Sequence, residues 1–369
     1  MRYELVSADD HVDLCYISPT LWQDRLPARW REQAPRVAHL PAGPTWVREG
    51  RPWGIYGSKR ADGRKVVFDV LGLSEEVEPG VWRATSPRHR LEDMDRDGVH
   101  AQVMYNFLDW SFTDQQLKTA CLQAFNSWLA DDLCAADRDR LVGLPTLPTQ
   151  DSTETVKELR RVMGLGLRGA IFDVFGAVKP IFDREWEPLW AAAEESGAVL
   201  SVHIGGGLHT LSAIPRGRNW SLPARASISC MQLEEVLVAL VFSGVLERHP
   251  RIRVVLGESS IGWVPFVLER MDYEVENYRG HVTDMPASVM PSEAFRRNVW
   301  VTFQDEKLGV RLIPEIGEDN VMWASDYPHA DGTFPHSAEA VDRIFAGSSP
   351  QIKRKATRDN ARRLYGIKG

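Results

Sequence analysis

Asp9 and His11 lie two residues apart in the stretch "LVSADDHVD" (residues 5–13), within an apolar, β-branched start that is typical of a buried strand. Because side chains alternate between the two faces of an extended strand, Asp9 and His11 point to one side and Asp10 to the other. A carboxylate and an imidazole on one strand can supply two ligands to a divalent cation. We therefore predict that this strand end belongs to a metal site and that Asp10 has a turn or supporting role.

Comparable polar residues end other apolar runs further along the chain. His203 ends the run in "LSVHIGGG", Glu258 follows one in "VVLGESS", and Asp326 follows one in "WASDYPH". Alone, His203 could be a hydrogen-bonded core histidine and Asp326 the start of a turn. Their shared position at strand ends favours a common site. Together with the pair on the first strand, His203 and Asp326 give two nitrogens and two oxygens, a set that suits zinc and also admits manganese.

Eight short apolar or β-branched runs alternate with longer helical patterns, which is typical of βα units around a parallel sheet. The expected strands are residues 4–8, 100–105, 141–144, 166–172, 198–203, 252–256, 299–303 and 321–324. The expected helices are residues 113–136, 153–163, 183–196, 227–247, 262–277, 336–345 and 351–364. No G-x-G-x-x-G follows the first strand, which counts against a dinucleotide-binding sheet. We therefore predict an α/β fold, a (β/α)₈ TIM barrel whose strand ends share one face.

Residues 14–90 interrupt this alternation with many prolines, glycines and tryptophans and with no long periodic pattern. We interpret them as an insertion after the first strand that covers the barrel mouth, the face on which barrel enzymes carry their active sites. The whole chain, residues 1–369, is then expected to be a single domain that contains this cap.

Composition excludes several other classes of protein. The net charge is -7 and the basic clusters are short, so we expect no nucleic-acid partner. The sequence contains no apolar run of membrane-spanning length and its first residues contain no apolar leader, so we expect a cytoplasmic protein without a membrane partner. Its 4 cysteines show no C-x-x-C spacing and predict neither a disulfide framework nor a thiolate zinc site.

Four stretches, "SADDHVD", "SVHIGG", "LGESSIGWVPFVLERMD" and "WASDYPHADGTFP", resemble the amidohydrolase superfamily, specifically the amidohydrolase-2 group related to aminocarboxymuconate semialdehyde decarboxylase. The resemblance covers nearly the whole chain. It implies a (β/α)₈ barrel with a divalent metal, zinc or alternatively manganese, and a chemistry of non-oxidative decarboxylation or of hydrolysis.

Site residues follow from this resemblance one by one. His11 matches the second histidine of the group's H-x-H, and Asp9 stands where the first would be, as a ligand that binds directly or through water. His203 matches the ligand on the fifth strand and Asp326 the aspartate on the eighth. The fourth strand, "GLRGAIFDV", offers no lysine that could be carbamylated to bridge two metals, so the resemblance implies a single metal ion.

Glu258 departs from the group, since several of its decarboxylases have a catalytic histidine after the sixth strand. Glu258 either forms a salt bridge, for example to Arg168, or acts as a proton donor or substrate anchor. Asn106, Phe107 and Trp110 follow the second strand and are expected, with His329, to contact substrate.

Two reactions fit one set of residues. For decarboxylation of a small carboxylated substrate, cyclic or aromatic, Asp326 or Glu258 would deliver a proton to the carbon that loses CO₂. For hydrolysis of an amide, lactone or similar bond, Asp326 would take a proton from a metal-activated water. The resemblance favours decarboxylation. A third possibility is a catalytically inactive barrel that acts as a binding protein. We also expect a homo-oligomer, a dimer, with the tryptophan-rich insertion as a possible interface.

Overall fold

Eight parallel strands form the centre of the protein in the computed structural model, which describes residues 5–57, 74–106, 108–205, 220–283, 285–286 and 288–368. The strands are β1 (Leu5–His11), β7 (Val99–Tyr105), β8 (Leu141–Gly143), β9 (Gly169–Ile171), β10 (Val199–His203), β11 (Arg253–Gly257), β12 (Val299–Phe303) and β13 (Val321–Trp323). All eight coincide with predicted strands. Their order in space is their order in the chain, in two arcs, β1–β7–β8 and β9–β10–β11–β12–β13.

The two arcs meet at both ends. A parallel bridge joins Thr146 to Ile171, and the Leu147 N–H donates to the Ile171 carbonyl at 2.9 Å. On the other side the Asp326 N–H donates to the Asp9 carbonyl at 3.1 Å, which links the end of β13 to β1. These contacts complete the predicted (β/α)₈ barrel.

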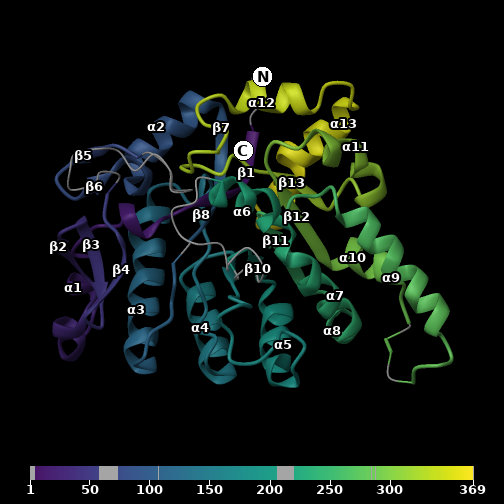
Figure 1. The fold of residues 1–369 in the computed structure, drawn as a ribbon, viewed down its shortest axis with the longest axis horizontal. Helices are drawn as coiled ribbons and strands as arrows, with labels where there is room; N and C mark the ends of the chain where they lie inside the picture. The colour runs from purple at the N-terminus through teal and green to yellow at the C-terminus, as the bar shows by residue number, and fades with distance from the viewer. Residues whose placement is uncertain are drawn as a thin grey trace.

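Helices surround the strands in chain order, and α3 (Gln115–Trp128), α4 (Ser152–Gly164) and α5 (Glu187–Ser196) stand side by side in Figure 1. The others that follow strands are α7 (Glu234–Phe242), α9 (Val264–Tyr278), α11 (Lys307–Ile316) and α12 (Ser337–Ile344). Asp114 caps α3 by accepting from two backbone N–H groups, and Gly197, at φ 68°, ends α5 in the left-handed conformation that glycine tolerates best. Within the described residues no helix is both long enough and apolar enough to cross a bilayer.

Several predicted helix boundaries were wrong. The helix expected at 227–247 is divided into α6 (Ser221–Ser229), α7 and α8 (Val245–Arg248), and Gly244 at φ 73° separates the last two. Three helices were not predicted: α2 (Pro87–Asp97), α10 (Pro291–Asn298) and α11. α2 and α10 are rich in charged residues and α11 contains Pro314, features that disfavour a helix when only the sequence is read.

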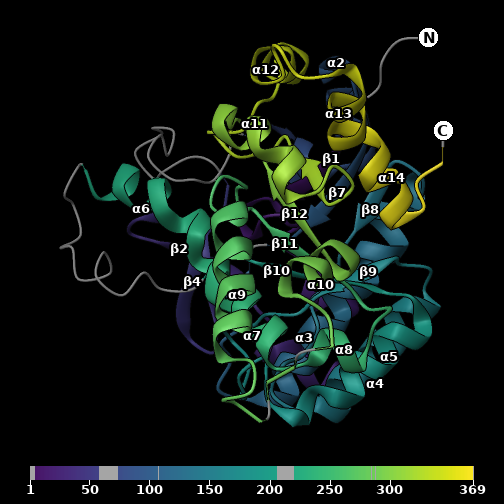
Figure 2. The ribbon, with the colours of Figure 1, turned by 90° about the vertical axis from the view of Figure 1, so that its right-hand side faces the viewer.

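The C-terminal helices α13 (Pro350–Arg354) and α14 (Asn360–Tyr365) close the amino ends of the strands (Figure 2). Arg168, before β9, donates to the Tyr365 carbonyl at 3.2 Å, and Arg253, which begins β11, donates to the Leu364 carbonyl at 3.3 Å. The opposite face, at the carboxyl ends of the strands, therefore remains for a site.

The insertion contains regular structure that the sequence analysis did not predict. β2 (Arg36–Leu40), β3 (Gly43–Arg48) and β4 (Arg51–Ile55) form an antiparallel sheet, and β5 (Glu76–Glu78) pairs with β6 (Val81–Trp82). Short strands containing Pro44 and Pro52 show too little alternation to be recognised. The predicted end at residue 90 falls inside α2. Trp22 and Trp46 are fully buried and pack edge to face at 5.1 Å, so these aromatic rings hold the insertion together.

β1 changes register just before its polar end. Val6 and Ala8 belong to the apolar core inside the barrel, together with Val103 and Val255. The pairing with β7 shifts between Ser7 and Asp10, as at a β-bulge. A bulge re-aims the residues that follow it, and bulges are common next to active sites.

Candidate metal centre

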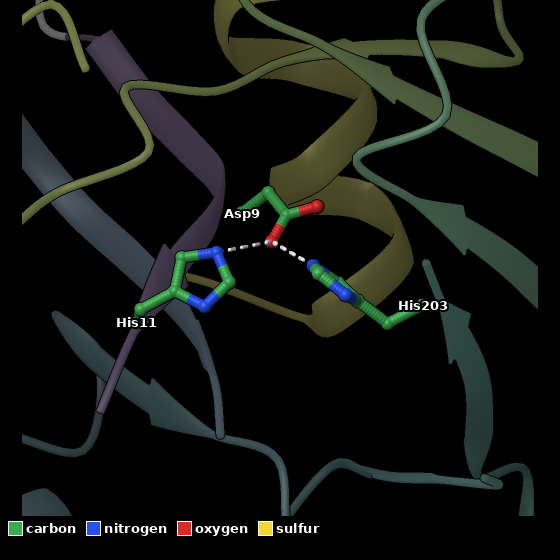
Figure 3. A group of neighbouring side chains, drawn as sticks. All are labelled: Asp9, His11 and His203. Carbon is green, nitrogen blue, oxygen red and sulfur yellow. Dashed lines mark ion pairs between the residues drawn. The ribbon is translucent and has the colours of Figure 1, made fainter. Parts of the chain in front are cut away.

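Four of the predicted ligands converge at the carboxyl ends of the strands, three of them shown in Figure 3. The Oδ1 atom of Asp9 lies 3.7 Å from Nε2 of His11 and 3.6 Å from Nε2 of His203. The Oδ1 atom of Asp326 lies 3.0 Å from the same nitrogen of His11. These side chains come from β1, β10 and the loop after β13, so the barrel brings together residues that are far apart in the chain.

Two hydrogen bonds orient the Asp9 carboxylate. Its Oδ2 atom accepts from the backbone N–H of Glu258 at 2.7 Å and from the hydroxyl of Thr302, on β12, at 2.8 Å. Its Oδ1 atom is buried and has no hydrogen-bond partner among the described residues. One oxygen is thus fixed by the protein while the other faces the two imidazoles, as in a carboxylate that binds a cation through one oxygen.

The imidazoles of His11 and His203 each direct Nε2 toward Oδ1 of Asp9. Nδ1 of His203 lies 2.8 Å from the Ile204 carbonyl, which fixes the proton there and directs Nε2 toward Asp9. His11 is fully buried, and burial, followed by the positive charge of His329, holds its pKa below the usual value. The neutral form of histidine that binds metals is therefore favoured at His11.

Buried polar atoms normally have hydrogen-bond partners, and a buried polar atom without a partner calls for an explanation. Oδ1 of Asp9, Nε2 of His11 and Oδ1 of Asp326 are all buried and lack a partner in hydrogen-bonding geometry within the described residues. A divalent cation between them would satisfy all three, and two imidazoles with two carboxylates are a suitable donor set for zinc or manganese. The residues present therefore fit a metal ion.

His329 lies behind this group. Its ring stacks on His11 at 4.0 Å, its Nδ1 lies 2.9 Å from Oδ1 of Asp326, and its Nε2 lies 3.5 Å from Oδ1 of Asp13. Burial lowers the pKa of His329, but the two carboxylates outweigh this and raise it well above the usual value. The same contacts hold the pKa of Asp326 far below its usual value, against the effect of burial. His329 was predicted to contact substrate. In the structure it contacts Asp326, and it is not among the described residues that line the cavity beside His203.

Glu258 faces the metal ligands and not Arg168. Its Oε2 atom lies 3.3 Å from Nε2 of His203, while Arg168 pairs with Asp139 at 2.8 Å near the opposite end of the barrel. The proposed salt bridge to Arg168 was therefore wrong. Removal from water and the negative charge of Asp326 raise the pKa of Glu258 to about 8, although 38% of its side-chain surface is exposed.

The backbone at both acidic residues is unusual. Glu258 has φ 50° and Asp326 has φ 60°, in the left-handed region that residues other than glycine rarely adopt. Such conformations cost free energy, and they cluster at functional sites where the surrounding structure enforces them. Here Asp10 supplies part of that enforcement, since one of its carboxylate oxygens accepts from the Ser325 hydroxyl at 2.5 Å and from the Tyr327 N–H at 3.0 Å.

A cavity of about 600 Å³ opens beside His203. It is lined by apolar and aromatic side chains, including Trp53 and Ile55 from the insertion and Trp110 and Phe175 from loops after strands. The insertion therefore contributes residues to the wall of this cavity. Polar side chains, among them Asn106, Lys118 and Asp173, line it as well. Aromatic walls combined with a set of polar groups are typical of sites for small cyclic molecules.

The predicted substrate contacts have different outcomes. Asn106 and Trp110 both line the cavity. The Asn106 amide is already engaged, because it donates to the Leu144 carbonyl at 3.1 Å and accepts from the Thr146 hydroxyl at 2.7 Å. Its contacts stabilise the cavity wall. Phe107 lies outside the described residues.

Thr302 was not predicted, and its bond to Asp9 makes a test possible. In Thr302→Val the carboxylate loses one of its two fixing hydrogen bonds, and loss of such outer contacts lowers metal affinity about 10- to 100-fold. We expect this loss in titrations of the metal-free protein with Mn²⁺ or Zn²⁺. Thr119→Val, on α3 away from the site, is the matched control. Equal affinities for the two variants would show that Thr302 does not position Asp9.

Gly257, at the end of β11, provides a second test. A Cβ atom there would lie 2.9 Å from Cδ2 of His203 and 3.1 Å from Oδ2 of Asp9, closer than normal packing allows. We expect Gly257→Ala to displace both side chains, to reduce bound metal, and to destabilise the fold by about 1–3 kcal/mol through overpacking. Gly164→Ala, in α4, has open space around the new Cβ, so it should leave the metal content unchanged and should not lower the melting temperature. Unchanged metal content in Gly257→Ala would contradict the proposed ligand positions.

Comparison with known proteins agrees with this geometry. A family model described as "Amidohydrolase" matches residues 38–367. A gamma-resorcylate decarboxylase of Rhodococcus jostii (strain RHA1) is 30% identical over 260 residues, which cover 66% of this chain and 75% of that protein. The structure of an amidohydrolase from Mycobacterium avium subsp. paratuberculosis K-10 superposes with a TM-score of 0.73 at 20% identity, covering 100% of this chain and 99% of the other.

A second solved structure contains a metal. The dihydroxybenzoic acid decarboxylase of Polaromonas sp. JS666, with bound manganese and the inhibitor 2-nitroresorcinol, has a TM-score of 0.65 at 18% identity, covering 99% of this chain and 97% of that one. At this identity the match shows the shared fold. The family model spans most of the chain, and with the Rhodococcus relative it confirms the resemblance seen in the four motifs: this chain belongs to the amidohydrolase family.

Proposed function

We propose that this chain is a metal-dependent enzyme that removes a carboxylate group non-oxidatively from a small aromatic acid. The observation that carries the proposal is the convergence of Asp9, His11, His203 and Asp326 beside a cavity with aromatic walls. The gamma-resorcylate decarboxylase relative supports this reaction over hydrolysis.

One divalent cation would be held by those four side chains. When bound, it would supply positive charge that attracts the substrate carboxylate and stabilises negative charge as it develops. Zinc is the sequence-based prediction, and the manganese in the Polaromonas neighbour supports the alternative. Reconstitution of the metal-free protein with each ion decides between them.

The other residues bind the ring and move the proton. Trp53 and Trp110 lie on the cavity wall, where their rings can pack against an aromatic substrate and exclude water. Loss of CO₂ leaves an electron pair on the ring carbon, which must receive a proton. Glu258 lies beside the proposed ligands and Asp326 is one of them, and Glu258 is the more accessible, with 38% of its side chain exposed against 7% for Asp326. In this proposal Glu258 is the first candidate for the donor and Asp326 the alternative.

Assays with two substrate panels test the proposal. Metal-loaded and chelator-treated protein are incubated with hydroxybenzoic acids in one panel and with amides and lactones in the other. We expect CO₂ from at least one aromatic acid, only with metal, and no turnover of the second panel. Hydrolysis of an amide or lactone without CO₂ release would replace decarboxylation by the alternative reaction. Absence of turnover with bound metal present would favour a binding protein.

Three further predictions remain to be tested. They are the organisation of residues 1–369 as one domain with residues 14–90 as its cap, the homodimer, and the cytoplasmic location. Sedimentation of the metal-loaded protein addresses the second.

A further inference from the structure

Lys118 is a buried cation on the wall of the cavity. It lies on α3, is only 8% exposed, and lines the same cavity as His203. A lysine is rarely buried to this extent unless it is paired, because burial of an ammonium group costs free energy. The Lys118 side chain makes no ion pair or hydrogen bond with any residue that the structure describes.

Asp109 and Asp173 also line this cavity and place negative charge near Lys118, but each makes contacts of its own. Asp109 pairs with Arg48, whose Nη2 lies 3.3 Å from its carboxylate, and one Asp173 oxygen accepts the N–H groups of Phe175 and Gly176. Burial therefore lowers the pKa of Lys118 in spite of Asp173 and Asp109, and the positive charge of Arg48 lowers it further. The Lys118 ammonium group thus lies in the wall of a cavity that Asp109 and Asp173 also line, and neither carboxylate forms an ion pair with it within the described residues, so an incoming anion could pair with it directly.

We infer that Lys118 binds a second anionic group of the substrate, a carboxylate on the ring that is retained while the carboxylate at the metal centre is lost. The inference rests on the proposed function, because it takes this cavity as the substrate site. It deepens that function by assigning the substrate class: aromatic dicarboxylates in preference to monocarboxylates. The two anionic groups would be held at separate places, one beside His203 and the other at Lys118, with the ring against the aromatic walls between them.

Ligand binding tests this inference without requiring turnover. Trp53 and Trp110 line the cavity, so quenching of tryptophan fluorescence in the metal-loaded protein reports occupancy. The probes are benzoate, with one carboxylate, and isophthalate and terephthalate, with two at different spacings. We expect at least one dicarboxylate to bind roughly 10-fold or more tightly than benzoate, as a charge-assisted contact of this kind would provide.

Variants at Lys118 identify the source of that preference. In Lys118→Met the preference for dicarboxylate over benzoate should fall about 10-fold. Lys157→Met, at an exposed lysine on α4, is the matched control and should keep the preference. The melting temperature of Lys118→Met should be unchanged or higher, because no ion pair is lost and an unpaired charge leaves the interior. Lys118→Gln repeats the test if the methionine variant folds poorly.

Two results would overturn the inference: no dicarboxylate preference in the natural protein, or a preference that survives in both Lys118 variants. These failures are separate from failure of the proposed function. A dicarboxylate preference without CO₂ release from any acid would leave the Lys118 site in place and contradict decarboxylation. Turnover of monocarboxylates with no dicarboxylate preference would support decarboxylation and contradict the Lys118 site.

Discussion

His203→Ala is expected to bind far less than one equivalent of metal and to lose at least about 1,000-fold in kcat/KM, since a bound cation contributes several kcal/mol of charge stabilisation in such reactions. The substitution removes the only ligand that β10 contributes to the four-residue set proposed above. It also leaves Oδ1 of Asp9 facing a single imidazole. Elemental analysis of protein purified without chelators measures the metal directly.

Stability gives a second readout of the same variant. A cation that binds only the folded state raises its melting temperature, so added metal should stabilise the natural protein much more than His203→Ala. His39→Ala, at an exposed histidine on β2, should behave as the natural protein. If His203→Ala kept its metal and its response to added metal, the proposed ligand set would be incorrect.

The second large effect is expected from substitutions of Glu258 and Asp326, the two candidate proton donors. Glu258→Gln should keep its metal, since the four proposed ligands remain, and lose roughly 100- to 10,000-fold in kcat, the range for removal of a positioned proton donor. Asp326→Asn should lose both metal and activity, because Asp326 contacts His11 at 3.0 Å and His329 at 2.9 Å. Paired measurements of metal content and kcat therefore separate the two roles.

Glu235→Gln, at an exposed glutamate on α7, controls for general effects of removing a carboxylate. If Glu258→Gln retained kcat within a few-fold and a metal-loaded Asp326→Asn did not, Asp326 would be the donor. Full activity in both variants would contradict delivery of the proton by either carboxyl group.

The fold could be predicted from sequence because the signals were local and repeated. All eight strands are short runs whose side chains are buried on both faces, and such runs are visible without tertiary information. Asp183 caps the short 3₁₀ helix (Arg184–Trp186) that leads into α5, and Gly197 ends α5, so both ends of the predicted segment carried a local signal. The insertion could not be predicted in detail, because its sheet forms from short strands whose aromatic residues are buried by tertiary packing.

Some residues of the candidate site could likewise be predicted from the sequence, and others could not. Asp9, His11, His203 and Asp326 were visible because each lies near or just after the carboxyl end of a strand, and a barrel brings strand ends together. Thr302 also ends a strand, in "VWVTF", but a lone threonine in a strand is ordinary and carries no signal of a ligand contact. Lys118 lies in a helix, where a lysine usually faces solvent, so only the structure shows that it is buried in the cavity wall.

One isotope measurement tests the central claim most directly. The metal-loaded protein is given the aromatic acid that it turns over, in water enriched in deuterium and ¹⁸O, and the organic product is analysed by mass spectrometry. Non-oxidative decarboxylation predicts one deuterium on the carbon that carried the carboxylate, one equivalent of CO₂, and no ¹⁸O in the organic product. A product that carries solvent ¹⁸O in a new carboxylate, without release of CO₂, would contradict the account and identify a hydrolase.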